Sequence, residues 1–327
     1  MTLAAVDATR LLDAIRVAAG NPEIRWARKP ERLMGGSWAD IFKVRLRGEP
    51  GFEGDLVVRI LPHPESWERE MLIQRYVARH GLLAPVVHMG ALPSRVFNRA
   101  WILMDFDSGR AWLSSTSDSA LAASVFFRSW SVPALVAKTA VAIHAIDAAP
   151  VAGALALPRA VAPVLEWLFS RASALGDREL VDRTQRLIAS RPRFQGAVLC
   201  HGGLHPLNIL RHPEYNTVLD WTHAQYDDPL YDLAFPYLSM DLVPVPTPVW
   251  MRPALVRMGH MQARRLLKEY EKASGVPIDR ARLHWFLRVV ALRILVEAAE
   301  DKARGQSASI ADSAAMVFEP YIRASGL

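Results

Sequence analysis

The residues best suited to chemistry lie in one polar loop that interrupts an apolar stretch of the 327-residue chain. The loop contains His201, His205 and Asn208, and Asp220 follows after a short apolar run. Turn-forming residues in between predict a hairpin centred near Glu214, which places Asn208 and Asp220 at equal distance from the turn. A carboxamide and a carboxylate are oxygen donors of the kind that Mg²⁺ prefers. We therefore predict that Asn208 and Asp220 form a magnesium site.

Three separated blocks of the sequence resemble the motifs of the aminoglycoside phosphotransferase family, which also contains choline-kinase-like enzymes. The family pattern reads H-G-D-x-H-x-x-N, then I-D-W-E, then G-D-P-x-x-D-L-A. This chain carries HGGLHPLN at 201–208, VLDWT at 218–222 and DDPLYDLA at 227–234, in the same order and with similar spacing. One departure matters most, because Gly203 stands where the family has its catalytic Asp. The resemblance extends over about residues 33–234.

The resemblance implies roles for the residues around this loop. His201 would fix the loop through hydrogen bonds, and His205 has a counterpart in many members of the family. Asp228 and Asp232 would hold the loop and the helix that follows it. His144 belongs to a segment similar to the family's L-H-A-L-D turn. Its place on an apolar helix face indicates a packed, hydrogen-bonded side chain in preference to a catalyst.

A glycine turn near the N-terminus is a candidate phosphate-binding loop. Gly35 and Gly36 would let backbone N–H groups approach a phosphate, and Ser37 adds a hydroxyl donor. A simple hairpin turn is the alternative. By resemblance, this segment corresponds to the loop that covers the nucleotide in the family.

Two charged residues further along the chain are candidates for holding phosphate. Arg59 is the one charge in the predicted strand 56–60, and Glu70 lies on the predicted helix 65–80. In the family a basic residue at this place binds phosphate and an acidic residue on the helix holds it, as in the Lys–Glu pair of protein kinases. The alternatives are an edge-strand Arg that faces water and a solvated helix Glu.

The pattern of elements predicts strands in the first part of the chain and helices in the rest, and the resemblance implies an α+β fold of the protein-kinase-like, two-lobed kind. By this resemblance, residues 1–104 would form a nucleotide-binding lobe with an antiparallel sheet, and residues 105–327 a larger, mostly helical lobe with the catalytic loop. Met104 and Phe106 lie in the link between them, which in the family offers backbone groups to adenine. The predicted elements are a helix at 3–19, a strand, glycine turn and strand over 33–44, strands at 56–60, 85–89 and 99–104, and helices at 65–80, 121–130, 135–146, 161–174, 177–190, 250–273, 280–304 and 309–323.

The glycine at position 203 puts catalysis in question. The family Asp accepts and orients the proton of the attacking hydroxyl, and a glycine has no group for either task. Three accounts stay open: a pseudokinase that binds ligand without turnover, an active enzyme whose base is His205, Asp227 or a water, and a substituted form of an Asp enzyme. Asp227 and Thr222 also differ from the family's Gly and Glu. They would lie on the acceptor side, so substrate choice would differ from that of the aminoglycoside enzymes.

Composition sets limits on partners and location. The formal net charge of +6 suits a polyanion such as a nucleotide but is too mild and dispersed to indicate nucleic acid. Charges and prolines interrupt the most apolar region, which excludes a membrane span there. Together with the lack of a signal-peptide pattern, this leads us to expect a cytoplasmic protein. Cys200, the single cysteine, is expected to be a buried core residue.

These observations lead to one expected function and one alternative. The expectation is transfer of a phosphoryl group from ATP or GTP, with Mg²⁺, to a hydroxyl of a small molecule such as an antibiotic or a metabolite. The activity would be impaired or atypical because the base is absent. The alternative is an inactive pseudokinase that binds nucleotide or a small molecule and acts by regulation or on a protein partner.

Overall fold

The computed structural model describes residues 5–33, 39–61, 67–81, 84–111, 130–154, 161–193, 196–242, 250, 252–303 and 310–326. The chain forms two compact units, and the chain passes between them more than once. The first, here called the sheet unit, comprises residues 1–115 and 207–222. The second, the helical unit, comprises residues 116–206 and 223–327. Residues 207–222 belong to the sheet unit although they follow residue 104, where the sequence placed the boundary between the two lobes.

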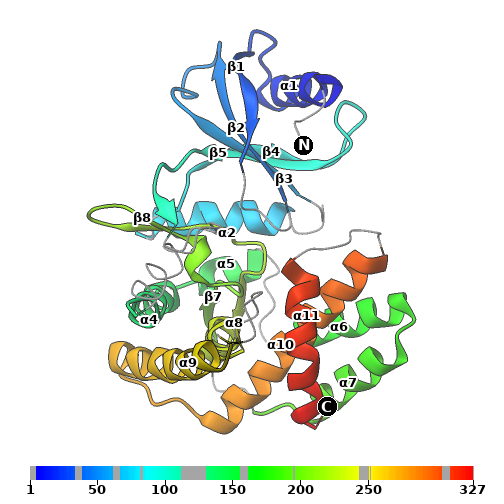
Figure 1. Ribbon diagram of the computed structural model, residues 1–327. Helices are drawn as coiled ribbons and strands as arrows, with labels where there is room; N and C mark the ends of the chain where they lie inside the picture. Colours follow the sequence, from blue (N-terminus) through cyan, green and yellow to red (C-terminus); the bar gives the residue numbers. More distant parts are fainter. Residues whose placement is uncertain are drawn as a thin grey trace. The chain divides into compact units, whose positions relative to one another are not determined.

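An antiparallel sheet forms the centre of the sheet unit (Figure 1). Within the described residues the sheet has five strands in the order β1-β2-β3-β5-β4, so β3 lies in the middle with a neighbour on each side. The sheet therefore confirms the predicted α+β class. Its strands are β1 (Arg25–Arg32), β2 (Asp40–Arg47), β3 (Leu56–Leu61), β4 (Val87–Ala91) and β5 (Ala100–Asp105).

Two helices bury the two faces of this sheet. Successive side chains of a strand point to opposite faces, so each strand contributes residues to both. Val58 and Trp101 belong to a cluster with residues of α1 (Ala5–Ala19). Leu61 and Ile102 belong to another cluster, against which residues of α2 (Trp67–Arg79) pack. Successive residues of a strand thus contact different helices.

The predicted strand before the glycine turn was placed wrongly. β1 ends at Arg32, so Leu33 is not part of the strand that the 33–44 pattern suggested, and Met34 lies outside the described residues. Only two of the residues of β1 are partly buried and the rest are exposed, which gave no alternation to detect. The turn itself, with Gly35, Gly36 and Ser37, lies outside the described residues.

The hairpin of the central motif is present, with a register one residue away from the prediction. β8 (Ile209–Arg211) pairs with β9 (Asn216–Val218), and Ile209 lies opposite Val218. Asn208 is therefore opposite Leu219, whose N–H donates to the Asn208 carbonyl at 2.8 Å. Asn208 and Asp220 are not equidistant from the turn, because the hairpin is centred between Pro213 and Glu214. The short strand β6 (Arg110–Ala111) pairs with the other edge of β8.

The helical unit holds most of the predicted helices within a few residues of their expected ends. A two-stranded ladder of β7 and β10 carries the segments on either side of the central motif. The predicted helix 121–130 lies outside the described residues, apart from Trp130. The observed elements are α4 (Val132–His144), α5 (Ala149–Ala154), α6 (Val161–Leu175), α7 (Arg178–Ala189), β7 (Val198–Cys200), β10 (Gln225–Asp227), α8 (Pro229–Asp241), α9 (Arg252–Ser274), α10 (Arg280–Ala303) and α11 (Ile310–Ala324).

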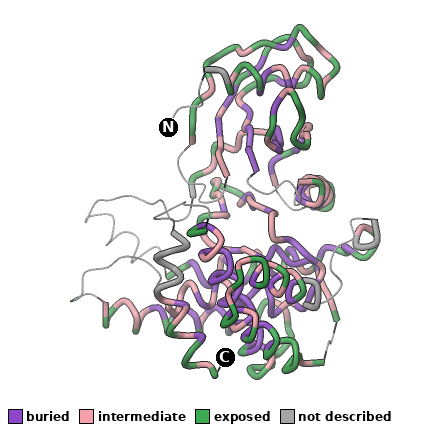
Figure 2. Tube along the Cα trace, turned by 90° about the vertical axis from the view of Figure 1, so that its right-hand side faces the viewer, coloured by how far each residue is buried: buried purple, intermediate pink, exposed green. Residues whose placement is uncertain are grey.

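Helix α10 is the central element of the helical unit. It is buried on nearly all sides between Leu283 and Ala298 and packs against α6, α7, α8 and α11. Figure 2 shows buried residues concentrated inside this unit and along the strands of the sheet. The stretch 289–298 is apolar apart from Arg293 and Glu297, as expected of a helix in the core. Among the described residues, no helix is long and apolar enough to cross a membrane.

Removal of the Phe286 ring from α10 tests this core. Phe286 is 1% exposed and makes edge contacts with Trp285 and Tyr231. We expect Phe286→Ala to lower the free energy of unfolding by about 3–5 kcal/mol, because a buried ring leaves a cavity. Val276→Ala, at a site that is 61% exposed, is the control and should change it by less than about 0.5 kcal/mol. Urea denaturation measures both, and equal midpoints for the two variants would contradict a core role for α10.

Candidate active site

Arg59 and Glu70 form a buried ion pair in the sheet unit. Strand alternation places Arg59 on the same face of β3 as Val57 and Leu61, which is the face that α2 covers. Glu70 lies in the first turn of α2, where the helix dipole favours a carboxylate. Arg59 is 7% exposed, Glu70 is fully buried, and Arg59 Nη1 donates to Glu70 Oε1. Both water-facing alternatives are therefore wrong for these two residues.

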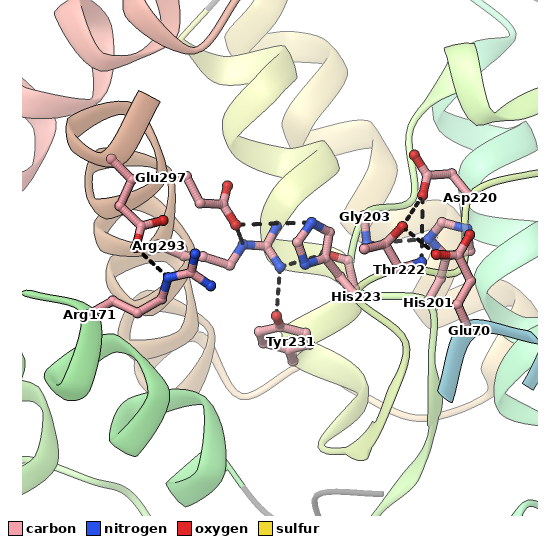
Figure 3. A network of polar contacts seen from close by, with 12 residues as sticks. Glu70, Arg171, His201, Gly203, Asp220, Thr222, His223, Tyr231, Arg293 and Glu297 are labelled. Atoms are coloured by element: carbon pink, nitrogen blue, oxygen red, sulfur yellow. Dashed lines mark hydrogen bonds and ion pairs between the residues drawn. The ribbon is translucent and has the colours of Figure 1, made fainter. Parts of the chain in front are cut away.

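Asp220 and Thr222 join this pair in one polar network. Figure 3 labels three of its members, Glu70, Asp220 and Thr222. Arg59 Nη2 donates to Asp220 Oδ1 at 2.8 Å and to Thr222 Oγ1 at 2.9 Å. The Thr222 hydroxyl lies 2.7 Å from Asp220 Oδ1 and 3.0 Å from Glu70 Oε2. The Thr222 hydroxyl thus belongs to the network around Arg59, and its expected influence on acceptor choice stays a prediction. We name these four residues the Arg59 network.

Burial and neighbouring charges oppose each other in the Arg59 network. Burial by itself would lower the pKa of Arg59, but the carboxylates of Asp220 and Glu70 outweigh it and raise that pKa. Burial raises the pKa of Glu70, and the Arg59 charge offsets only part of the effect. Within the network one guanidinium faces two carboxylates. A second guanidinium, that of Arg69, donates to the Thr222 carbonyl at 2.9 Å and also opposes the rise in the pKa of Glu70.

The backbone at Asp220 is unusual. Its φ of 65° lies in the left-handed region, and among the described residues it is the one non-glycine residue with a positive φ. Asp tolerates this conformation better than most residues, yet it still carries a cost of the order of 1 kcal/mol or more. Leu219 pairs with the backbone of Asn208, so Asn208 and Asp220 lie at the same end of the hairpin. That the two side chains bind the same Mg²⁺ stays a prediction.

In the helical unit, Asp232 holds the loop that begins at His201. Its carboxylate accepts the backbone N–H groups of His201 at 3.0 Å and Gly202 at 2.8 Å. His144 Nε2 lies 3.2 Å from the same carboxylate, and His144 Nδ1 lies 2.8 Å from the Tyr270 hydroxyl. Burial would raise the pKa of Asp232, but the hydrogen bond and charge of His144 lower it overall. The structural roles predicted for His144 and Asp232 are confirmed.

Three further predicted residues in or near this loop, His201, Asp228 and Cys200, also lie inside the helical unit. His201 is fully buried, and its Nδ1 accepts the N–H of Gly203 at 3.3 Å, as expected of a residue that fixes the loop. Asp228 caps α8 by accepting the Leu230 N–H at 3.0 Å. Cys200 is fully buried, as predicted, and burial raises the pKa of its thiol.

Of the candidates for a replacement base, Asp227 is poorly placed for that role. Asp227 is fully buried in β10, where it accepts from Gln225 Nε2 at 3.0 Å and from the Asp228 N–H at 2.7 Å. No substrate in solvent can reach it there. The His205 ring is tilted against Phe235 of α8, with 5.6 Å between ring centroids.

The residues of the predicted link belong to the sheet unit. Met104 is 7% exposed, and its sulfur lies 3.6 Å from Gln74 Nε2. The N–H of Phe106 donates to the Asp55 carbonyl at 3.2 Å, and its ring lies 4.0 Å from Lys43 Nζ. The predicted contact of these residues with adenine stays a prediction.

Gly202 and Gly203 have different reasons to be glycine. Gly202 has a φ of 75°, and a Cβ there would lie 2.2 Å from the His223 carbonyl oxygen. At Gly203 the backbone is outside the left-handed region, and an added Cβ would meet nothing closer than His223 Cδ2 at 3.8 Å and His201 Nδ1 at 3.9 Å. Backbone and space at Gly203 therefore admit a side chain.

Sequence reasoning missed a second polar cluster, in which Arg293 of α10 is central. Arg293 Nη1 donates to the Gly202 carbonyl at 2.8 Å and to the Tyr231 hydroxyl at 2.6 Å. Its Nε lies 3.8 Å from Glu297 Oε1, and His223 Nε2 lies 3.9 Å from the same oxygen. Figure 3 shows the His223 ring beside Gly203 and Arg293 reaching toward Tyr231. An Arg and a Glu four residues apart in the otherwise apolar stretch 289–298 of α10 were the available signal.

The antiparallel sheet unit and the larger, mostly helical unit together form a kinase-like fold. The model of the phosphotransferase enzyme family APH matches residues 40–284, so the chain belongs to this family. No curated protein sequence matches the chain.

Solved structures with a similar fold cover nearly the whole chain. A macrolide 2'-phosphotransferase type I is 18% identical, with a TM-score of 0.58 and coverage of 97% of this chain and 98% of its own. A choline/ethanolamine kinase family protein from Mesorhizobium loti is 16% identical, with a TM-score of 0.59 and coverage of 97% and 94%. A thermostable mutant of an aminoglycoside phosphotransferase, in ternary complex with AMP-PNP and hygromycin B, is 16% identical, with a TM-score of 0.56 and coverage of 95% and 98%. At these identities the likeness shows the fold.

The difference between the two glycines can be tested by substitution. We expect Gly203→Asp to keep the free energy of unfolding within about 1 kcal/mol of the wild type, since its Cβ meets only ordinary contacts. Gly202→Asp should lose several times more, because of its positive φ and the clash with the His223 carbonyl. Thermal and urea unfolding compare the two. Similar losses for both would show that position 203 is as restricted as position 202.

The buried carboxyl of Asp227 predicts a pH dependence of stability. Burial raises the pKa of Asp227 from 3.8 to about 8, against the opposing charge of Arg191. Between these values the folded chain keeps a proton that the unfolded chain releases, so this contribution to stability is lost as the pH rises from about 4 through about 8. Relative to Asp227→Asn, the wild type should lose stability over this range. Urea denaturation at several pH values measures the difference, with exposed Glu53→Gln as control, and parallel curves for wild type and Asp227→Asn would contradict it.

Proposed function

We propose that this protein transfers the terminal phosphoryl group of ATP, with Mg²⁺, to a hydroxyl group of a small molecule. The observation that carries the proposal is the Arg59 network, in which a buried Arg on β3 is held by Glu70 of α2 and joined to Asp220. A solvated structural role does not account for burying these charges together, since an unpaired or needless buried charge is expensive. Kinase-like enzymes use an ion pair of this kind to position nucleotide phosphates.

The residues of the sheet unit fit the nucleotide and its metal. Arg59 keeps its charge through the carboxylates beside it, so it is suited to bind a phosphate oxygen. Asp220 and Asn208 offer the oxygen donors that Mg²⁺ prefers, at the end of one hairpin. Mg²⁺ would supply neutralisation of the charge that develops on the phosphates. Gly35, Gly36 and Ser37 stay candidates for covering the phosphates, and Met104 and Phe106 for contact with the base of ATP or GTP.

Membership of the family and a neighbour's ligands support the choice of substrates. The structure similar in fold binds AMP-PNP, a nucleotide analogue, together with hygromycin B, a small molecule. By analogy, this chain would bind a nucleoside triphosphate and a hydroxylated small molecule. The Thr222 side chain belongs to the Arg59 network and Asp227 is buried in β10.

Gly203 favours one alternative, an inactive pseudokinase that binds nucleotide and acts on a partner. Loss of a general base typically lowers a rate by about 10²–10⁴-fold, while positioning and electrostatics persist. A wild type without ADP formation that gains it in Gly203→Asp, on a panel of hydroxylated compounds, would favour this alternative. Turnover by the wild type supports the transferase.

Nucleotide binding can be tested without knowing the acceptor. Mg²⁺–ATP should raise the melting temperature of the wild type, since a ligand at about 100 times its Kd stabilises the folded state by about 2.7 kcal/mol. Asp220→Ala and Arg59→Met should lose most of the Mg²⁺–ATP shift, while Glu53→Ala, at an exposed site of the same unit, should keep it. Differential scanning fluorimetry with and without Mg²⁺ measures the shifts. No shift at millimolar nucleotide, with Asp220→Ala like the wild type, would reject both the transferase and the nucleotide-binding pseudokinase.

A further inference from the structure

The side chains nearest to the empty position at Gly203 are two histidines. Among the described residues, His223 Cδ2 and His201 Nδ1 are the atoms within 4 Å of a Cβ built there. His201 is fully buried, and its Nδ1 already accepts the Gly203 N–H. The His223 side chain is 36% exposed, so a substrate can reach it from solvent. His223 is thus the accessible titratable group beside the position of the missing Asp.

The backbone holds His223 at this place. Gly202 approaches the His223 carbonyl so closely that a Cβ at 202 would lie 2.2 Å from that oxygen. Only a glycine permits this approach, which fixes the segment before β10 against the loop that begins at His201. The Gly202 carbonyl is in turn held by Arg293 Nη1 at 2.8 Å. These contacts hold the main chain from which the His223 imidazole projects.

A carboxylate lies behind the imidazole. His223 Nε2 is 3.9 Å from Oε1 of Glu297, which is 9% exposed. This is longer than a hydrogen bond, and such contacts in ligand-free sites commonly tighten when substrate binds. Burial raises the pKa of Glu297 to about 7, against the opposing charges of Arg293 and Arg171, so an ionised fraction persists near neutral pH. The charged or titratable groups from the elements packed around this site are His201, Tyr231, Arg171, Arg293, Glu297, Glu300 and Asp301.

From this geometry we infer that His223 accepts the proton of the acceptor hydroxyl in place of the Asp that Gly203 lacks. The inference rests on the proposed phosphoryl transfer. A neutral imidazole nitrogen takes the hydroxyl proton while the hydroxyl oxygen forms a bond to the terminal phosphorus of the nucleoside triphosphate. The bond between that phosphorus and the bridging oxygen breaks, and its electron pair leaves on the nucleoside diphosphate. The imidazolium then releases the proton to solvent, and Glu297 acts as a positioning residue.

The other candidates for the base fit the structure less well. No atom of His205 is within 4 Å of the Cβ position at Gly203. Asp227 is fully buried in the ladder of β7 and β10. A histidine is also the side chain whose ordinary pKa, about 6.5, suits proton transfer at neutral pH.

The test is a set of variants in which the two possible bases are exchanged. ADP formation from Mg²⁺–ATP is measured with water and with a panel of hydroxylated small molecules as acceptors. We expect His223→Gln to lose about 10²–10⁴-fold in rate. His284→Gln, at an exposed position of α10, is the control and should keep the rate. Gly203→Asp combined with His223→Gln should recover most of the loss, because a carboxylate then occupies the family's position.

The rescue and its pH profile separate a base from a structural residue. If His223 only supported the fold, the double variant would stay as impaired as His223→Gln. The acidic limb of the rate profile should move to lower pH in the double variant, because an Asp replaces a His as proton acceptor. Glu297→Gln should shift this limb in the wild type with a smaller loss in rate. Equal rates for His223→Gln and wild type, or a wild type that forms no ADP with any acceptor, would overturn the inference.

A second measurement needs no turnover and no nucleotide. The His223 imidazole can be followed by NMR in the free protein, with its signal assigned by loss in His223→Gln. We expect it to titrate at a higher pH in Gly203→Asp than in wild type, since the new carboxylate would lie beside the ring. An unchanged titration would contradict the proximity of the two positions. Retained stabilisation by Mg²⁺–ATP in His223→Gln shows that nucleotide binding stands by itself, so failure of this inference is distinguishable from failure of the proposed function.

Discussion

The burial of Arg59 in the middle strand of the sheet constrains much of the sheet unit. A guanidinium that is removed from water needs carboxylates around it, and strand alternation directs this one toward α2. Glu70 and Asp220 meet the requirement from a helix and from a hairpin that are far from each other in sequence. The Arg59 network thus ties β3, α2 and the segment after β9 together.

A second constraint acts in the helical unit, where two charged side chains hold main-chain groups of the loop that begins at His201. Asp232 accepts the N–H groups at the start of the loop, and Arg293 binds the Gly202 carbonyl. Gly202 has no alternative to glycine, whereas Gly203 has both the backbone and the space for a side chain. The loss of a side chain at 203 is therefore not a requirement of the fold. His223 is a titratable side chain next to the position that lacks one.

Much of the architecture could be predicted because it follows from local patterns. The helices of the second half appear in the sequence as long apolar periodicities, and β3 and β5 as short apolar runs. β1 could not be predicted, because most of its residues are exposed and show no alternation. The hairpin register was wrong by one residue, because turn-forming residues alone do not determine where the turn is centred. The left-handed backbone at Asp220 leaves no signal in composition or periodicity.

The sequence by itself determined the family, the fold class and the absence of an Asp at position 203, because each is a matter of residue types in order along the chain. It also singled out Arg59 and Glu70, although it left their burial open. Only the tertiary structure decided that these two charges are paired in the core and that Asp227 is enclosed. It alone placed His223 against Gly203, through contacts between main-chain segments twenty residues apart. Burial and proximity depend on how distant segments pack against each other, and the spacing of residues within one motif does not determine that packing.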